Sequence, residues 1–305
     1  MRITLIGQAA FGASVLDALL KREEQVVAVY VPPDTPGNKT DPLKQLAGQQ
    51  GIPVFQPARM RHPAVYKQYT NSAPDLGVMA FVTDFVPLPV LQYPKMGTIQ
   101  YHPSLLPRHR GGSAMNWPIM NGEKKTGITI FWPDDGIDTG PILMQKEVEI
   151  TPGDTLGTLY FNKLFPMGVE ALMESIDLVY QGKAPRIPQD ETQATYEGLC
   201  QEKDAVIDWR KPIADVYNLI RGTNPQPGAI TASQMGRLKI FDCEPLARDI
   251  RGVPGEVVEI SERGMVVAGQ GGCLLIKQVQ PQSSPNVSAS AYAHATGLKA
   301  GSKLG

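Results

Sequence analysis

The sequence is poor in cysteine and histidine, has almost no net charge and contains no long apolar run. It has 305 residues, with three cysteines, four histidines and a formal net charge of −1. A charge this close to zero gives no overall attraction to nucleic acid. No stretch of about 20 apolar residues occurs, so we expect no membrane span, and the short apolar start is not that of a signal peptide. The widely spaced Cys200, Cys243 and Cys273 predict free thiols in a cytoplasmic protein rather than disulfides or a zinc site.

Strand-like runs alternate with helical patterns over roughly the first two thirds of the chain. The strand-like runs are RITLIG (2–7), QVVAVYVPP (25–33), IPVF (52–55), DLGVMAFV (75–82), MGTIQYHPS (96–104) and TGITIFWP (126–133). Helical spacing is found in FGASVLDALLKRE (11–23) and DPLKQLAGQQG (41–51), and residues 155–183 form a longer helical pattern that we expect to break near Pro166. This alternation predicts an α/β domain with a Rossmann-like parallel sheet.

The pattern changes near residue 205. After the helical segment PIADVYNLIRG (212–222), glycine and proline separate three strand-like runs: RLKIFDCEPL (237–246), GEVVEISERGMVVAG (255–269) and GCLLIKQVQP (272–281). They predict a small C-terminal β-barrel of the OB-like type. We therefore expect two domains, 1–200 and 205–305. The polar stretch 188–204 is the expected connection, and the Ser- and Ala-rich tail from Gln282 is expected to have little regular structure.

The glycine turn after the first strand is a weak signal. GQAAFG (7–12) lacks the second glycine of a G-x-G-x-x-G dinucleotide motif. The second strand ends in two prolines rather than in an acidic residue. The turn therefore predicts a tight strand-to-helix connection rather than a dinucleotide site.

The stretch TIQYHPSLLPRHRGGSAMNW (98–117) places polar residues at the end of a predicted strand. Alternation puts Gln100 and His102 on one side of that strand. Open α/β sheets bind their ligands beyond the carboxyl ends of the strands. A second strand-like run leads into PDDGIDTGPIL (133–143), which holds three carboxylates. If both strands lie in one sheet, their carboxyl ends converge and a carboxylate meets His102.

A histidine, a carboxamide and a carboxylate in one pocket suit attack on a carbonyl group. The amide can donate a hydrogen bond to a developing oxyanion, while the histidine and the aspartate move protons. The ligand set is poor for a metal, and none is predicted. HPSLLP is no nucleophile elbow, so Ser104 is expected to form a turn. His109 is expected to be a solvated loop residue, and Arg108 and Arg110 to be surface charges or contacts to an anionic ligand tail.

These motifs closely resemble the folate-dependent formyltransferase family, whose members move or release the formyl group of 10-formyltetrahydrofolate. HPSLLPRHRGGSAMNW (102–117) followed by GITIFWPDDGIDTGPIL (127–143) carries the resemblance, which also covers the opening strand and turn, IRGTNPQPGA (220–229) and the β-rich end. It implies that 10-formyltetrahydrofolate is the formyl donor and that His102 and Asp138 are catalytic. The family usually has Asn where this chain has Gln100, which keeps the carboxamide on a longer arm. Gln100 is the third expected catalytic residue.

The resemblance also implies a folate-binding region. It places the pterin slot at MAFVTDFVPL (79–88) and lets the DTGPI turn (138–142) close over the folate. The residues expected to contact the folate are Phe81, Asp84, Leu88, Ser104, Arg110 and Gly140.

Within the family, the sequence motifs YHPSLLPRHRG, MNW and ATYEG are most similar to those of the N-terminal hydrolase domain of 10-formyltetrahydrofolate dehydrogenase. That branch implies hydrolysis to tetrahydrofolate and formate, with water as the acceptor. The chain has no room for the dehydrogenase domains, so no dehydrogenase reaction is expected of it alone. The alternatives are a methionyl-tRNA formyltransferase, an N-formyltransferase of an amino sugar or other amine, and a non-catalytic folate-binding protein. Retention of both His102 and Asp138 argues against the last.

A tRNA acceptor is not favoured by the distribution of charge. Loop 32–45 holds only Lys39 and Lys44, offset by Asp34 and Asp41. Residues 205–305 contain 11 Lys and Arg against 8 Asp and Glu, a net charge of +3 without clusters. Binding to a tRNA backbone normally uses a clear basic patch.

Overall fold

The computed structural model describes residues 1–247 and 252–305 and contains two compact units. Unit 1 comprises Met1–Gly111, Gly127–Val148 and Phe161–Tyr196, and unit 2 comprises Gly112–Thr126, Glu149–Tyr160 and Glu197–Gly305. Two segments that precede residue 200 thus pack with the C-terminal part of the chain. No sequence pattern indicated this grouping.

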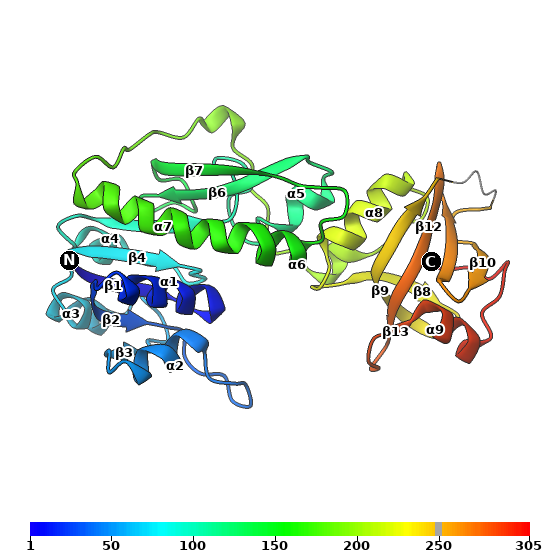
Figure 1. Ribbon diagram of the computed structural model, residues 1–305, viewed down its shortest axis with the longest axis horizontal. Helices are drawn as coiled ribbons and strands as arrows, with labels where there is room; N and C mark the ends of the chain where they lie inside the picture. The colour runs from blue at the N-terminus through cyan, green and yellow to red at the C-terminus, as the bar shows by residue number, and fades with distance from the viewer. Residues whose placement is uncertain (248–251) are drawn as a thin grey trace. The chain divides into compact units, whose positions relative to one another are not determined.

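Unit 1 is built on a seven-stranded sheet in the order β3-β2-β1-β4-β5-β6-β7 (Figure 1). The strands are β1 (Arg2–Gly7), β2 (Gln25–Tyr30), β3 (Val54–Phe55), β4 (Leu76–Ala80), β5 (Thr98–His102), β6 (Lys125–Phe131) and β7 (Ile142–Glu149). Neighbours from β3 to β5 pair in parallel, which confirms the predicted sheet. The central strand β4 is buried along its whole length, as expected of a parallel strand covered on both faces.

The direction of β6 corrects one prediction. β6 runs antiparallel to β5, with Gln100 opposite Phe131 and His102 opposite Thr129. The carboxyl ends of the two strands therefore lie at opposite ends of the pair and do not converge. Alternation of strands and helices predicts parallel strand pairs. It does not indicate that a later strand joins the parallel strands in the antiparallel direction. The chain must return through the loop after β6 before Asp138 can approach His102.

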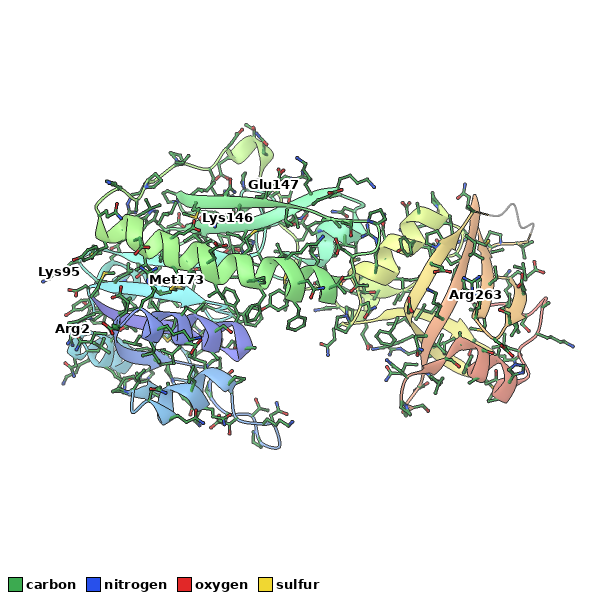
Figure 2. All side chains as sticks on the ribbon, viewed as in Figure 1. Arg2, Lys95, Lys146, Glu147, Met173 and Arg263 are labelled. Atoms are coloured by element: carbon green, nitrogen blue, oxygen red, sulfur yellow. The ribbon has the colours of Figure 1, made fainter. Side chains whose placement is uncertain are left out.

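The helices of unit 1 are α1 (Ala9–Lys21), α2 (Pro42–Gln49), α3 (Pro63–Asn71), α4 (Leu88–Gln92) and α7 (Phe165–Tyr180), with a short 3-10 turn at Glu191–Gln193. The first two were predicted from their periodicity. The predicted break near Pro166 is also confirmed, because a π-helical turn (Tyr160–Leu164) precedes α7 and Pro166 lies in its first turn. Helix α7 packs against α1 (Figure 1). Lys146 of β7, labelled in Figure 2, binds Glu174 of α7 with 2.7 Å between Nζ and Oε1.

The turn between β1 and α1 is tight, as predicted. A Cβ atom on Gly7 would lie 2.3 Å from the carbonyl oxygen of Ala80, so only glycine fits there. Ala9 begins α1 with φ +59°, and its N–H donates to Asp41 Oδ2 at 2.8 Å. The start of α1, where a phosphate would sit in a dinucleotide fold, thus already holds a carboxylate of the same chain.

Unit 2 contains an antiparallel sheet in the order β10-β11-β12-β9-β8, with β13 paired to β12. Its strands are β8 (Ala229–Ser233), β9 (Gly236–Leu246), β10 (Val257–Ser261), β11 (Gly264–Gly269), β12 (Gly272–Pro281) and β13 (Val287–Ser288). Its helices are α5 (Asn116–Met120), α6 (Leu156–Leu159), a 3-10 turn (Glu202–Ala205), α8 (Ile213–Gly222) and α9 (Ala289–Thr296). The predicted antiparallel domain is confirmed. Within the described ranges, no strand pair joins β10 to β8 to close a barrel.

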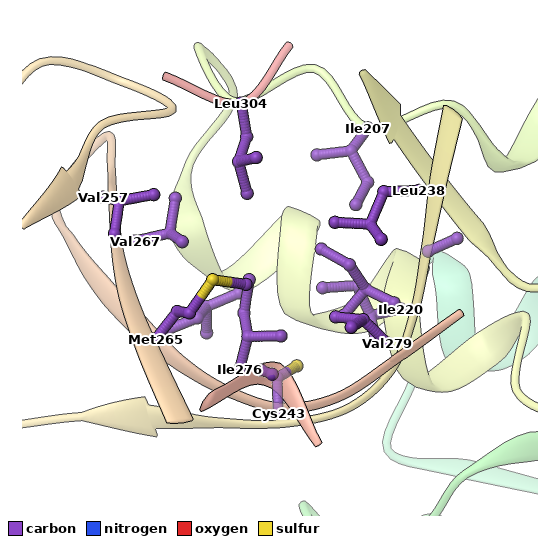
Figure 3. Close-up of a cluster of buried hydrophobic side chains, with 14 of the residues drawn as sticks. Ile207, Ile220, Leu238, Cys243, Val257, Met265, Val267, Ile276, Val279 and Leu304 are labelled. Atoms are coloured by element: carbon purple, nitrogen blue, oxygen red, sulfur yellow. The ribbon is translucent and has the colours of Figure 1, made fainter. Parts of the chain in front are cut away.

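One apolar core lies between this sheet and α8 (Figure 3). The prediction of an unstructured tail is wrong, because α9 places Tyr292 and Ala293 in this core. Ser288 caps the helix by accepting from the N–H of Ala291, and Gly297 ends it with φ +69°. The helix is built of Ala, Ser and Thr with few large apolar residues, so it shows no apolar stripe in the sequence.

No helix in the described parts of the chain has the length and apolar character needed to cross a membrane. The three cysteines are free thiols. Burial raises the pKa of the half-buried Cys200 to about 11, and burial also raises the pKa of the buried Cys243 well above its ordinary value.

Candidate active site

Strand β5 presents Gln100 and His102 on one face of the sheet. Tyr101 between them is buried and stacks on Phe11 of α1, with ring centroids 4.3 Å apart. Because strand side chains alternate, the two neighbours of Tyr101 point to the opposite face, as predicted. Gln100 is half-buried, and its carboxamide forms no hydrogen bond with any part of the chain that the structure describes. Both of its amide N–H groups are therefore available to a ligand.

His102 is 5% exposed and its ring is held at both nitrogens. Nε2 lies 2.8 Å from the backbone carbonyl oxygen of His109. A carbonyl oxygen can only accept, so Nε2 donates and carries a proton. Nδ1 faces the Asp138 carboxylate, 3.5 Å from Oδ2. Nδ1 is therefore the ring nitrogen that faces the carboxylate of Asp138.

Asp138 reaches His102 from the loop between β6 and β7. Its Oδ2 also accepts a hydrogen bond from the backbone N–H of Gly111 at 2.8 Å. The oxygen that faces His102 is therefore the one held by this backbone N–H. Asp138 has φ +56°, in the left-handed region, and His109 has φ +57°. Backbone conformations of this kind cost on the order of 1–3 kcal/mol each and cluster at functional sites. Each of the two loops that hold the His102–Asp138 pair thus contains at least one strained residue.

The other two carboxylates of the loop do not reach His102. Asp134 Oδ1 accepts from the N–H of Gly136 at 3.0 Å and from the hydroxyl of Thr139 at 2.6 Å, which builds the turn. Asp135 is exposed. Only glycine fits at position 140, because a Cβ atom on Gly140 would lie 1.8 Å from the carbonyl oxygen of Trp132. Of the three carboxylates, only Asp138 is placed for chemistry at β5.

Arg110 is fully buried rather than a surface charge. Its Nε and Nη2 donate to Gln189 Oε1 at 3.1 and 2.7 Å, and its two terminal nitrogens donate to the Glu191 carboxylate at 2.9 and 2.6 Å. Nη1 also donates to the hydroxyl of Tyr196. The hydrogen bonds with Glu191 raise the pKa of Arg110 above its ordinary value. All five N–H donors are used, so none is left for the predicted ligand tail.

Two further predictions about this loop have different outcomes. His109 is 4% exposed, so the expectation of a solvated side chain is wrong; its carbonyl orients His102. The error arose because flanking arginines indicate solvent in a sequence, while here Arg110 is itself buried. Ser104 is buried and donates its hydroxyl to the carbonyl of Arg108 at 2.7 Å, which confirms its turn role. The hydroxyl proton of Ser104 is therefore used within the turn formed by residues 104–108.

The three predicted pterin contacts line two different cavities. Phe81, with φ +62°, and Asp84 border a cavity of about 220 Å³ at the ends of β1, β2 and β4. Asp84 also accepts the N–H of Met60 at 2.8 Å. Leu88 borders a cavity of about 440 Å³ that is also lined by Trp132 and Asp134. Only the second cavity touches the loop that carries Asp138.

Sequence reasoning missed the two backbone groups that orient the pair, the carbonyl of His109 and the N–H of Gly111. Every residue type carries these groups, so no signal in the sequence could have identified them. Among the described residues, no cluster of three or more His, Cys, Asp or Glu side chains is arranged to hold a metal ion. A buried histidine facing a carboxylate, beside an unpaired carboxamide, can move a proton and bind an oxyanion.

Comparisons with known proteins identify the family of both parts of the chain. Residues 1–176 match the formyl transferase family, and residues 200–296 match the formyl transferase C-terminal domain. The chain is 41% identical over 311 residues to mitochondrial 10-formyltetrahydrofolate dehydrogenase of Mus musculus, a match that covers 96% of this chain and 33% of that protein. The chain thus spans about a third of the length of such relatives. It is 33% identical over 308 residues to methionyl-tRNA formyltransferase of Syntrophus aciditrophicus (strain SB), covering 99% of this chain and 98% of that one.

A solved structure supports the fold. HypX from Aquifex aeolicus in complex with tetrahydrofolic acid superposes with a TM-score of 0.69 at 19% identity, covering 96% of this chain and 47% of that chain. At this identity the likeness concerns the fold alone.

Proposed function

Because this chain belongs to the formyl transferase family, we propose that it releases the formyl group of 10-formyltetrahydrofolate to water, giving tetrahydrofolate and formate. The observation that carries the proposal is the buried pair of His102 Nδ1 and Asp138 Oδ2, 3.5 Å apart, at the end of β5. Plain binding of a folate needs no such pair. A non-catalytic folate-binding protein is therefore the contrasting hypothesis.

In the proposed reaction, water attacks the formyl carbon and its carbonyl oxygen becomes an oxyanion. The Gln100 carboxamide, which has free N–H groups, donates to that oxyanion. The proton of the attacking water passes to Asp138 or to Nδ1 of His102. The same pair then delivers a proton to N10 of the folate as the bond between carbon and nitrogen breaks. The formic acid released in this step loses its remaining proton to solvent as formate, so the reaction needs only the folate and water.

We propose that the pterin ring enters the cavity bordered by Leu88, Trp132 and Asp134. Its lining and its volume of about 440 Å³ suit a small heteroaromatic ring, and it touches the loop that carries Asp138. Residues 79–88, with Phe81 and Asp84, stay the predicted wall of the folate site. The domain division at residues 200–205 and a cytoplasmic location likewise stay predictions.

Water is favoured as the acceptor by two observations. Similarity is higher to 10-formyltetrahydrofolate dehydrogenases than to the methionyl-tRNA formyltransferase. In loop 32–45, Lys44 is paired with Asp34, so the loop presents no basic cluster to a tRNA. Methionyl-tRNA is the second candidate acceptor, because the match to that enzyme extends over almost the full length of both chains.

A direct assay tests the proposal. The purified chain is incubated with 10-formyltetrahydrofolate alone, with methionyl initiator tRNA, and with amino sugar nucleotides, and both tetrahydrofolate and formate are measured. We expect turnover without an acceptor and equal amounts of the two products. Turnover that requires the tRNA or an amine would identify a transferase. Tight folate binding without turnover under any condition would contradict an enzymatic role.

A further inference from the structure

The segment from Ile187 to Tyr196, named the strap, is the last part of unit 1 before the chain continues into unit 2. It begins with a pair of backbone hydrogen bonds between Ile187 and Ile142, at 2.8 and 2.9 Å. Near its end, Arg110 N–H donates to the carbonyl of Thr195 at 3.0 Å. The large apolar side chains of the strap, Ile187 and Tyr196, are 53% and 59% exposed. Hydrogen bonds rather than apolar burial therefore hold the strap in place.

Gln189 joins the strap to the loop of Asp138. Its Nε2 donates to the carbonyl of Asp138 at 2.8 Å and to that of Gly140 at 2.7 Å. Its Oε1 accepts both hydrogen bonds from Arg110. A guanidinium only donates, so the side-chain oxygen must face Arg110 and the amide nitrogen must face the two carbonyls. All four hydrogen-bonding positions of this one side chain are used, and two of them fix the peptides around Asp138.

Thr195 joins the strap to the loop of His109. Its Oγ1 accepts the backbone N–H of His109 at 2.8 Å. The carbonyl of His109 in turn accepts from Nε2 of His102. Thr195 therefore lies two hydrogen bonds away from the imidazole, through a residue with φ +57°.

We propose that the strap positions the catalytic pair, with Gln189 setting Asp138 and Thr195 setting His102. This inference rests on the proposed function of His102 and Asp138. A left-handed backbone at a non-glycine residue persists only where its surroundings over-determine it. Asp138 and His109, the two such residues that contact the pair, are both hydrogen-bonded to the strap. Neither Gln189 nor Thr195 touches the reacting atoms, so both are positioning residues. Without them the carboxylate and the imidazole move apart, and a shift of about 1 Å can cost on the order of 100-fold in rate.

The test compares four variants of the full chain. We expect Gln189→Ala to lower kcat on the order of 100-fold and Thr195→Val about 10-fold, with KM nearly unchanged. Thr195→Ser keeps the hydroxyl and should restore the rate. The matched control is Gln193→Ala, since Gln193 lies on the strap but, among the described residues, hydrogen-bonds to Asp190 alone, with 2.8 Å between Nε2 and Oδ2. It should behave as the parent. Full kcat in Gln189→Ala would overturn the proposal, and if that variant does not fold, equal rates for Thr195→Val and Thr195→Ser would do so.

A second readout does not depend on turnover. Nitrogen-15 NMR of the imidazole rings gives separate signals for Nε2 and Nδ1 of His102 and reports which nitrogen is protonated. We expect Nε2 to be protonated in the parent and in Gln193→Ala, and we expect the Nδ1 signal of His102 to shift in Gln189→Ala because the Asp138 carboxylate moves. If the parent protein never turns over 10-formyltetrahydrofolate, the proposed function is wrong, but this NMR measurement still tests whether the strap positions His102. Unchanged His102 signals in both Gln189→Ala and Thr195→Val would then refute the strap as a positioning element.

Discussion

One group of polar side chains in each unit illustrates a difference in hydrogen bonding. In unit 2, the buried Trp209 Nε1 donates to Oγ1 of the buried Thr231 at 3.0 Å, so the indole N–H is satisfied within the unit. In unit 1, Nδ1 of His102 faces the Asp138 carboxylate, and the Gln100 carboxamide forms no hydrogen bond within the described chain. Buried polar groups are normally satisfied, so spare capacity inside a fold marks the place where a ligand or a reaction is expected.

Two buried arginines in the described part of the chain, Arg221 and Arg110, also differ in what they bind. Arg221 of α8 donates to Asn218 and to the carbonyls of Thr151 and Asp154, which ties residues 149–160 to the rest of unit 2. Its burial lowers its pKa. Arg110 faces a carboxylate, which raises its pKa, and it fixes a glutamine that bonds to the loop of Asp138. One arginine joins backbone segments, and the other supports the candidate active site.

The largest effect should come from His102→Ala. This change removes the proton-exchanging nitrogen next to Asp138, and we expect kcat to fall about 1,000-fold or more, since general acid–base catalysis contributes roughly 10²–10⁴-fold. Thr231→Val removes a buried hydroxyl from unit 2 and should leave kcat unchanged. Both are measured as formate release from 10-formyltetrahydrofolate, with circular dichroism to verify folding. Near-parental activity of His102→Ala would place the chemistry elsewhere.

A change in the apolar core of unit 2 should affect stability but not turnover. Ile276 is fully buried on β12, between β9 and β11 (Figure 3). Ile276→Ala should lower the free energy of unfolding by about 2–5 kcal/mol through lost burial and a residual cavity. The exposed neighbour Gln278 supplies the control, because Gln278→Ala creates no cavity. Urea unfolding and kcat at a temperature well below the transition measure the two effects. A lower kcat in fully folded Ile276→Ala would show that the unit 2 sheet contributes to the reaction.

A smaller effect is expected at Gln100. Gln100→Asn shortens the arm by one methylene group, about 1 Å, and should change the hydrolysis rate by about 10–100-fold because the oxyanion donor moves. Formate release without acceptor is compared with formyl transfer to each acceptor. If neither rate changes, Gln100 only lines the pocket and the site works with His102 and Asp138 alone.

The sequence predicted those features that repeat along the chain. Strands β1, β2, β4 and β5 and helices α1, α2 and α8 follow apolar periodicity, which is a local property. The direction of β6 and the packing of α9 depend on partners far away in the chain, and periodicity cannot report them. The same limit applies to the site. A family motif identifies His102 and Asp138. The residues that position them lie far away in the sequence: Gln189 is 51 residues from Asp138, and Thr195 is 86 residues from His109. Both act through backbone groups, which no sequence motif reports.

The strap also has a consequence for how such enzymes can be recombined. The match to the catalytic family ends at residue 176, whereas the hydrogen bonds that hold the His102 and Asp138 loops come from residues 189 and 195. A chimaera joined at the family boundary would pair the catalytic loops of one parent with the strap of another. The transplantable unit of this candidate active site therefore extends to Tyr196, and a crossover placed after that residue keeps the loops and their supports from one parent.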